Sequence, residues 1–419
     1  MQPHNSSKLL LGNRSFVSYL IVRVTSSLAI QMVAVAVGWQ IYDLTKSTFY
    51  LGLVGLVQFV PVVLLTLVVG YVADNFNRKV VIAICGAVGA AVLVLLAMGS
   101  QNGWISTNLI LLTVFLIGAI NAFDGPTMQS MLPNIVDREL FQQATALASS
   151  GFQAATIIGP ALGGVLYAFH PAVVYGIAAG CMAASIIFIM PVSCTRASTE
   201  REPVSIKSMM AGISFIKRKP IILGAISLDL FAVLFGGATA LLPVYASTIL
   251  SAGPIGLGLL RAAPAIGALL MTVYLIRKPL KRHVGRTMFI SVVIFGAATI
   301  VFAVSQSVLL SIISFFVLGA ADMISVVVRG TLVQMGTPDA MRGRVSSVNF
   351  VFIGTSNQLG EFESGITATA FGPVAAAVIG GVATIAVVAI WMKLFPALAK
   401  VDRFPDMEAA PAEAGEGFK

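Results

Sequence analysis

The segment Gly70-Tyr-Val-Ala-Asp74-Asn-Phe-Asn-Arg78-Lys79 is a short polar interruption between two long apolar stretches, 49–72 and 80–100. A helix of about 20 apolar residues crosses the ~30 Å hydrocarbon core of a bilayer, and both stretches are long enough. Asn75 and Asn77 tolerate left-handed backbone conformations, so the segment can form a tight turn. The sequence here predicts two membrane helices joined by a polar turn.

The alternation of apolar stretches and polar gaps continues over the whole chain. Of 419 residues, 58% are hydrophobic and 10% are charged, and the mean hydropathy is +0.95. Soluble domains are about half apolar and a quarter charged, and no water-soluble core could bury this much apolar surface. The sequence predicts an all-α membrane protein with twelve transmembrane helices, over residues 16–42, 49–72, 80–100, 107–131, 142–168, 171–192, 220–248, 255–276, 287–305, 308–333, 345–371 and 373–392.

Basic residues are distributed so that they fix the expected orientation. They concentrate at the termini and in the gaps after even-numbered stretches, as in the pair Arg78 and Lys79 and the group within 277–286. Cytoplasmic loops carry the excess of Lys and Arg, so we expect both termini and all even gaps to be cytoplasmic. This bias and anionic lipid headgroups account for the net charge of +9, and we expect no nucleic-acid partner.

The longest polar gap divides the chain into two halves. We expect an N-terminal six-helix half over 1–192, a cytoplasmic linker over 193–219, a C-terminal six-helix half over 220–392 and a cytoplasmic tail over 393–419. Apolar linker residues at helical spacing beside Lys207 and Lys217 indicate an interfacial helix, with a plain solvated linker as the alternative. From Pro396 onward the tail is too polar to pack, so we expect it to be disordered.

A short pattern recurs in both halves. Gly125-x-x-x-Gln129-x-x-x-Pro133 returns 205 positions later as Gly330-x-x-x-Gln334-x-x-x-Pro338. The chain therefore looks like a duplicated six-span unit, with chance agreement as the alternative. Such repeats place a substrate path between the halves near the middle of the membrane.

Eight charged residues lie inside the apolar stretches. At mid-span a charge that faces lipid costs roughly 2.5–3.5 kcal/mol, so eight would cost on the order of 20 kcal/mol, above a typical folding free energy of about 5–15 kcal/mol. They must therefore face the bundle interior or a wet cavity. They are Arg23, Asp124, Asp229, Arg261, Asp322, Arg329, Glu361 and Glu363.

The carboxylates in the second half are candidate proton carriers. Asp229, Asp322 and Glu361 lie near the middle of their spans, and burial favours the neutral form of a carboxylate. Glu363 is the fourth candidate, but at ~100° per residue it points some 200° away from Glu361. We therefore expect only one of the two glutamates to line a path.

The arginines are candidate partners for these carboxylates. Arg23 and Asp124 both lie towards the cytoplasmic side of the first half, where they could form a salt bridge. Arg261 and Arg329 could neutralise carboxylates of the second half as a fixed scaffold, which is the alternative to proton transport. At offsets of 205 and 206, Asp124 corresponds to Arg329 and Arg23 to Asp229, so equivalent positions carry opposite charge.

Uncharged polar residues inside the spans offer hydrogen bonds to a polar or amphipathic solute. The candidates for a substrate path are Gln31, Asn121, Asn357 and Gln358. The three cysteines and three histidines have no metal-ligand or redox spacing, and motifs for nucleophilic catalysis or phosphate binding are absent. We therefore expect no cofactor, no metal and no enzymatic activity.

The opening segment resembles the signature loop of the major facilitator superfamily, which has a glycine, an aspartate four residues later and then a basic pair. Twelve spans, a long central linker and cytoplasmic termini extend the resemblance over nearly the whole chain. In that family the loop is a latch that stabilises one access state. The resemblance implies this role for Gly70, Asp74, Arg78 and Lys79. Asn75 and Asn77 replace the family's usual basic residue and glycine, which leaves the details of the latch open.

Further motifs narrow the resemblance. Gly159-Pro160-Ala-Leu-Gly163-Gly164 resembles the family's antiporter motif, which is found mainly in exporters. Its glycines permit close helix approach, and Pro160 removes a backbone donor and bends the helix; helix packing alone is the alternative reason for the glycines. The segments 132–144, 258–264 and 337–345 resemble the branch that contains the enterobactin exporter and macrolide efflux proteins.

The resemblance implies the major facilitator fold and a secondary active transporter. We expect a monomer in the bacterial inner membrane that exports a small amphipathic compound, siderophore or drug-like, by alternating access coupled to protons. An importer or lipid transporter of the same fold is one alternative. A receptor or assembly factor that has kept the fold without transporting anything is another.

Overall fold

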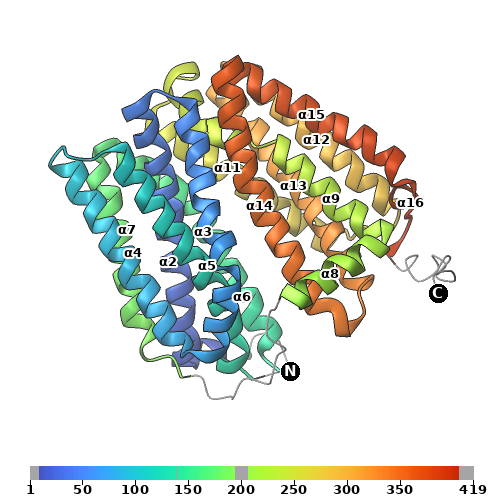
Figure 1. Ribbon diagram of the computed structural model, residues 1–419, viewed down its shortest axis with the longest axis horizontal. Helices are drawn as coiled ribbons and strands as arrows, with labels where there is room; N and C mark the ends of the chain where they lie inside the picture. Colours follow the sequence, from blue (N-terminus) through green and yellow to red (C-terminus); the bar gives the residue numbers. More distant parts are fainter. Residues whose placement is uncertain (1–8, 138, 194–205, 405–419) are drawn as a thin grey trace.

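The computed structural model describes residues 9–137, 139–193 and 206–404, and their regular structure is helical. Eleven helices in this part of the chain are long and apolar enough to cross a membrane. Figure 1 shows them as two bundles, the first coloured blue to green and the second yellow-green to red. The prediction of an all-α membrane protein is confirmed.

Each bundle contains six long helical segments. The first bundle is formed by α2 (Arg14–Thr45), α3 (Thr48–Asn75), α4 (Arg78–Gln101), α5 (Thr107–Ile135), α6 (Phe141–Phe169) and α7 (Pro171–Ile189). The second is formed by α9 (Pro220–Phe235), α11 (Gly253–Arg277), α12 (Val284–Val304), α13 (Val308–Met335), α14 (Asp339–Phe371) and α15 (Pro373–Leu394). Helix α8 (Ile206–Arg218) precedes the second bundle, and we call the end of the molecule where it lies the linker end and the opposite end the far end (Figure 1).

The turn between α3 and α4 is only two residues long, Phe76 and Asn77. Asn77 has φ −64° and ψ 114°, so this turn does not use its tolerance of the left-handed conformation. Its side-chain oxygen instead accepts a hydrogen bond from the backbone N–H of Lys79 at 3.0 Å. Because an asparagine side chain satisfies an otherwise unpaired N–H at a helix start, Asn77 acts as the N-cap of α4.

The predicted span 220–248 is broken in its second half. Helix α9 ends at Phe235, and after Gly236 and Gly237 the chain continues as the 3-10 turn η1 (Ala238–Leu241), α10 (Leu242–Val244) and the π turn η2 (Tyr245–Ile249). A Cβ at position 237 would lie 2.6 Å from the carbonyl oxygen of Gly360 in α14. Only glycine allows this approach, which brings the break next to α14.

Helix α14 differs from the other long helices in polarity. It spans 33 residues and includes the predicted span 345–371, but it is not among the eleven apolar helices. It carries Glu361 and Glu363, and it packs on α3 of the other bundle as well as on α9 and α15. Its polar side chains are thus covered in part by these neighbours, and both glutamates are half-buried.

The two bundles meet closely at the far end. Thr48 Oγ1 of α3 lies 2.9 Å from Thr369 Oγ1 of α14. On the other side of the seam, the α6 residue Gly164 packs against Gly258 of α11, and a Cβ at position 258 would lie 3.2 Å from the Cα of Gly164. Towards the linker end the ribbons of α3 and α14 diverge (Figure 1).

Part of the predicted tail is folded. Residues 396–404 include the short helix α16 (Pro396–Ala399), and Leu398 is fully buried. The carbonyl oxygen of Val401 accepts a hydrogen bond from the N–H of Gly285 at 3.0 Å. The expectation of disorder from Pro396 onward is therefore wrong for this segment, because its backbone and apolar side chains pair with the start of α12. The rest of the tail lies outside the described residues.

Helix α8 occupies the described part of the predicted linker. A Cβ at position 212 would lie 2.9 Å from the carbonyl oxygen of Arg344 and 3.0 Å from Val348 Cγ2, both in α14. Lys217 and Arg218 form its last turn. The described part of the linker thus contains a helix, and this helix packs on the second bundle.

Candidate functional site

A cavity of about 110 Å³ lies between the two bundles. The first bundle contributes residues of α2, α3 and α5 to its wall, and the second contributes η1, α10, α11 and α14. Most of the lining is aliphatic, as at Val33, Val54 and Ile117. Among the described residues that line it, those with charged or amide side chains are Gln58, Arg261 and Glu361.

Arg261 enters this cavity from α11. Its guanidinium reaches towards the first bundle, since a Cβ at position 38 of α2 would lie 3.7 Å from its Nη2 atom. Its Nε atom is buried and has no hydrogen-bond partner among the described residues. Buried polar groups are nearly always hydrogen-bonded, so this donor calls for a partner that the described residues do not supply.

Glu361 enters the cavity from α14 and packs against α3. A Cβ at position 55 would lie 2.7 Å from Glu361 Cβ and 2.9 Å from its Oε2 atom, so Gly55 makes room for this side chain. The negative charge of Glu361 acts on Arg261. Glu363 does not line the cavity; its Oε1 atom accepts a hydrogen bond from Thr367 Oγ1, one turn along α14, at 2.8 Å.

A buried ion pair lies inside the second bundle. Arg329 Nη1 of α13 is 2.9 Å from Asp229 Oδ2 of α9, and the side chains are 5% and 7% exposed. Ser325 Oγ donates a hydrogen bond to Asp229 Oδ1 at 3.3 Å, and Arg329 Nη1 donates one to Asn349 Oδ1 at 3.5 Å. The pair thus joins α9, α13 and α14.

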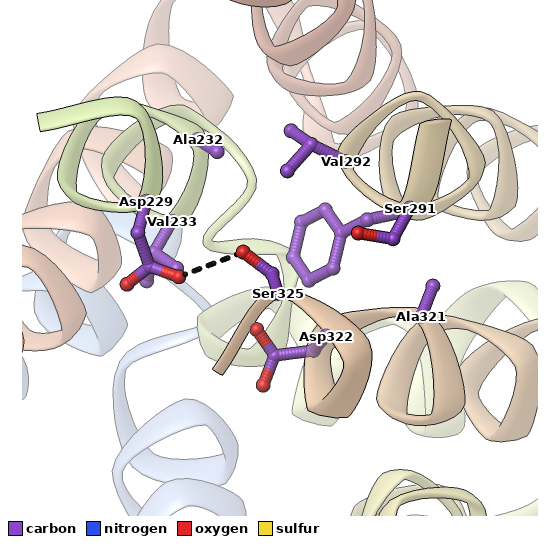
Figure 2. A pocket seen from close by; sticks show the side chains of 9 residues that line it. Asp229, Ala232, Val233, Ser291, Val292, Ala321, Asp322 and Ser325 are labelled. Atoms are coloured by element: carbon purple, nitrogen blue, oxygen red, sulfur yellow. Dashed lines mark hydrogen bonds between the residues drawn. The ribbon is translucent and has the colours of Figure 1, made fainter. Parts of the chain in front are cut away.

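Asp322 lies beside this ion pair. It lines a second, smaller cavity of about 10 Å³ together with Asp229 and Ser325 (Figure 2). A space of that size holds about one water molecule. The charges of Asp229 and Arg329 both act on Asp322, so two carboxylates share one guanidinium in this interior. A proton on one carboxylate would make the group neutral.

The first bundle contains a looser counterpart of this ion pair. Arg23 of α2 and Asp124 of α5 act on each other electrostatically, but the described structure has no salt bridge between them. The Arg23 guanidinium lies over the ring of Phe152 in α6, with Cζ 5.4 Å from its centroid. Positions that correspond in the two bundles thus carry charges of opposite sign.

Two of the predicted latch residues, Arg78 and Lys79, contact α5 and the end of α7 at the linker end. Arg78 Nη1 donates a hydrogen bond to the carbonyl oxygen of Ser130 in α5 at 3.1 Å, and Lys79 Nζ donates one to the carbonyl oxygen of Met190 at 2.9 Å. Gly70 and Asp74 belong to α3, but their surroundings lie outside the described side chains.

The motif at 159–164 forms the seam between α6 and two other helices. Gly159 and Gly163 face α2. A Cβ at position 159 would lie 2.6 Å from Gln31 Cβ, and a Cβ at position 163 would lie 2.9 Å from the carbonyl oxygen of Met32. Gly164 and the carbonyl oxygen of Pro160 face α11 of the other bundle. The motif therefore fixes the approach of both neighbours.

The four predicted substrate-path residues are absent from the lining of the central cavity. Gln31 packs on α6, Asn121 is half-buried on α5 and Asn357 is exposed. Gln358 has a buried Oε1 atom without a hydrogen-bond partner among the described residues.

The sequence reasoning missed Gln58, which does line the cavity. Leu51, Val54 and Gln58 follow one another at helical spacing on the same face of α3, and all three line it. The sequence did contain a signal for Gln58, since this polar residue lies on the same face of α3 as the small Gly55.

Comparisons with known proteins agree over nearly the whole chain. A family model described as "Transmembrane secretion effector" matches residues 9–413. The enterobactin exporter EntS of Citrobacter koseri is 28% identical over 418 residues, which cover 96% of this chain and 97% of that protein. EntS of Escherichia coli O81 is 26% identical over 354 residues, which cover 81% of this chain and 82% of that protein.

Solved structures of transporters share the fold. The nucleoside transporter NupG superposes with a TM-score of 0.67 at 17% identity, covering 91% of this chain and 99% of that one. A POT family transporter bound to 5-aminolevulinic acid gives a TM-score of 0.72 at 11% identity, covering 93% and 97%.

Proposed function

Because the chain belongs to the transmembrane secretion effector family of the major facilitator superfamily, we propose that it exports a small amphipathic compound by alternating access. Membership makes it a multi-pass secondary transporter and not an enzyme. We further propose that it works in the bacterial inner membrane and that proton entry drives export. The relatives named as enterobactin exporters support export and a siderophore-like or drug-like compound.

The observation that carries the proposal is the cavity between the bundles and the way it is closed. Both bundles contribute to its wall, as an alternating-access site requires. At the far end, the approach of Gly164 to Gly258 and the contact between Thr48 and Thr369 hold the bundles together. On the orientation predicted from charge, the far end is the outer one. This supports loading of the cavity from the cytoplasm, the first step of export.

The group around Asp322 supports the proton-coupling part of the proposal. Asp229 already pairs with Arg329, so Asp322 is the carboxylate without a positive partner of its own in this interior. Charging a buried carboxylate without compensation is costly, and the adjacent cavity has room for one water molecule that would give a proton a route to it. Asp322 is therefore our first candidate for the proton site, with Asp229–Arg329 as its scaffold. Both lie outside the central cavity, so the proton and the compound would bind at different places.

Transport in inverted membrane vesicles tests both parts of the proposal. Vesicles that contain the full-length protein are energised with ATP, and uptake of a panel of amphipathic acids, bases and neutral compounds is measured against vesicles without it. We expect uptake of at least one class, which collapses when nigericin removes the pH gradient. Uptake only into right-side-out vesicles would show an importer, and binding without uptake of any compound would favour a receptor.

An Asp322→Asn variant then separates coupling from transport. We expect this variant to move the compound down the compound's own concentration gradient at the wild-type rate. It should lose the uptake that the pH gradient drives. Glu363→Gln is the matched control, because this half-buried glutamate bonds within its own helix and does not line either cavity. Unchanged proton-driven uptake by Asp322→Asn would exclude Asp322 as the proton site.

A further inference from the structure

We propose that Arg261 binds an acidic group of the transported compound, so that the central cavity selects amphipathic organic anions such as carboxylates or acidic phenols. This inference rests on the proposed transport function and names its substrate class. It starts from the charges that face the cavity, which in the described structure are those of Arg261 and Glu361.

The two charged groups are not equally open to a ligand. Glu361 is backed by α3, where Gly55 leaves no space beyond its Cβ and Oε2 atoms. Arg261 has a buried Nε–H without a hydrogen-bond partner among the described residues. A guanidinium presents its donors as a planar fork that fits a carboxylate through two hydrogen bonds. The geometry therefore favours an anion at Arg261 over a cation at Glu361.

Glu361 supplies the charge that balances Arg261 when no compound is bound. Its negative charge acts on Arg261, and an isolated guanidinium in an apolar cavity would be costly. An entering anion must compete with this carboxylate. Removal of the Glu361 charge should therefore strengthen anion binding, whereas the same change should weaken the binding of a cation.

The wall and the size of the cavity define the rest of the ligand. Apart from the polar groups, the lining is made mainly of aliphatic side chains such as Val37, Leu51 and Val114. The volume of about 110 Å³ is somewhat below the ~150 Å³ of an engineered cavity that binds benzene. A ring that carries an acidic group therefore needs somewhat more room than this conformation offers, which the movement of the bundles in alternating access would supply. A membrane potential that is negative inside would also favour the outward movement of an anion.

Calorimetry with three matched probes tests the subsite on the full-length protein in nanodiscs. Salicylate is the anion, salicylamide its neutral analogue and benzylamine the cation. We expect salicylate to bind most tightly, Arg261→Gln to weaken it roughly ten- to hundred-fold and Glu361→Gln to tighten it. The affinity for salicylamide should change less than three-fold in either variant. Arg277→Gln, which removes an exposed charge at the end of the same helix, should leave all three probes unchanged.

The double variant Arg261→Gln/Glu361→Gln guards against misfolding, because it removes both charges together. If the double variant binds salicylamide as tightly as the wild type does, the cavity is intact. If it also binds salicylate no more tightly than salicylamide, the subsite is assigned. Equal salicylate affinity with and without Arg261 would overturn the subsite, and so would preferential binding of benzylamine that depends on Glu361.

The vesicle assay keeps this inference separate from the proposed function. Arg261-dependent binding of salicylate without uptake of any anion would leave the subsite standing and refute transport. Uptake of compounds that is indifferent to their charge and to Arg261→Gln would leave transport standing and refute the subsite.

Discussion

Asp229 of α9 and Arg329 of α13 form a salt bridge of 2.9 Å in the interior of the second bundle. The corresponding positions of the first bundle hold Arg23 in α2 and Asp124 in α5, with the charges exchanged between the two helices. The same two helices of each repeat are thus coupled by opposite charges, tightly in one bundle and loosely in the other. The two bundles should therefore differ in how far they tolerate loss of these charges.

Arg329→Met should strongly destabilise the protein. It leaves Asp229 and Asp322 together without a positive partner, and loss of one member of a buried ion pair costs about 3–5 kcal/mol. Thermal unfolding of the detergent-solubilised protein, followed by its size-exclusion profile, measures the effect. Arg23→Met should cost less, because Arg23 forms no salt bridge with Asp124 in the described structure and lies over Phe152.

Two further variants complete this test. Asp229→Asn combined with Arg329→Met removes both charges of the pair and should recover part of the lost stability. Arg277→Gln is the surface control, since this side chain is exposed at the end of α11. Equal loss of stability in Arg329→Met and Arg23→Met would contradict the difference between the bundles.

The sequence predicts which residues are buried charges better than it predicts which of them meet. A charge inside an apolar stretch is visible from composition alone, because lipid excludes it. Whether Arg261 faces Glu361 depends on the rotation of α11 and α14 about their axes, and these helices are fixed by glycine contacts far away in the sequence. Spacing within one helix contains no information about such contacts.

Two local features escaped prediction for different reasons. The break after Phe235 depends on Gly360 of α14, which packs where a side chain at position 237 would lie, so hydropathy alone predicts an unbroken span. The sequence groups residues 396–404 with the polar tail that follows them, yet they fold because Leu398 and Val401 are buried and their backbone pairs with the start of α12. In both cases a long-range contact overrides the local pattern.

A disulfide between positions 48 and 369 should trap the far end closed. The Oγ atoms of Thr48 and Thr369 are 2.9 Å apart, and side chains in such contact are close enough for the ~2.05 Å sulfur–sulfur bond. In a background without the native cysteines, Thr48→Cys/Thr369→Cys should cross-link on mild oxidation, lose transport and regain it on reduction. Either single cysteine variant serves as the control. Transport that survives complete cross-linking would show that the bundles need not separate there.

Asp402 should make the fold of residues 396–404 sensitive to acid. The backbone N–H of His283 donates a hydrogen bond to its carboxylate at 2.9 Å, and this bond, with the nearby Arg282 and Arg403 side chains, lowers the pKa of Asp402. Because its pKa is lower in the folded state, its stabilising contribution is present above the unfolded value of about 3.9. The contribution is lost as the pH falls through the folded value.

Hydrogen exchange at the start of α12 measures this effect. The amides of Val284 and Gly285 donate to the carbonyl oxygens of Asp402 and Val401, so we expect Asp402→Ala at pH 7 to speed their exchange several-fold. In the wild type, protection corrected for intrinsic rates should fall below about pH 4. Asp43→Ala, which breaks an exposed pair with Lys46 at the far end, should leave these amides unchanged. Equal protection in Asp402→Ala and wild type would refute the role of the carboxylate.

Larger residues at the seam between α6 and α11 should have the opposite effect to the disulfide. A Cβ at position 164 would collide with the carbonyl oxygen of Pro254 and would lie 3.1 Å from the Cα of Gly258, and backbone cannot move aside as a flexible side chain can. Gly164→Val should therefore penalise the closed far end and shift the population towards a conformation in which that end is open. In the Thr48→Cys/Thr369→Cys background, Gly164→Val should slow cross-linking at least several-fold. In the Thr369→Cys single variant, it should speed the reaction of that cysteine with a membrane-impermeant maleimide.

Gly176→Val is the matched control, because nothing lies within 4 Å of a Cβ at that position of α7. If Gly164→Val unfolds the protein, Gly164→Ala supplies the same test with a single methyl group. Unchanged cross-linking in a folded variant would mean that this seam does not hold the far end closed.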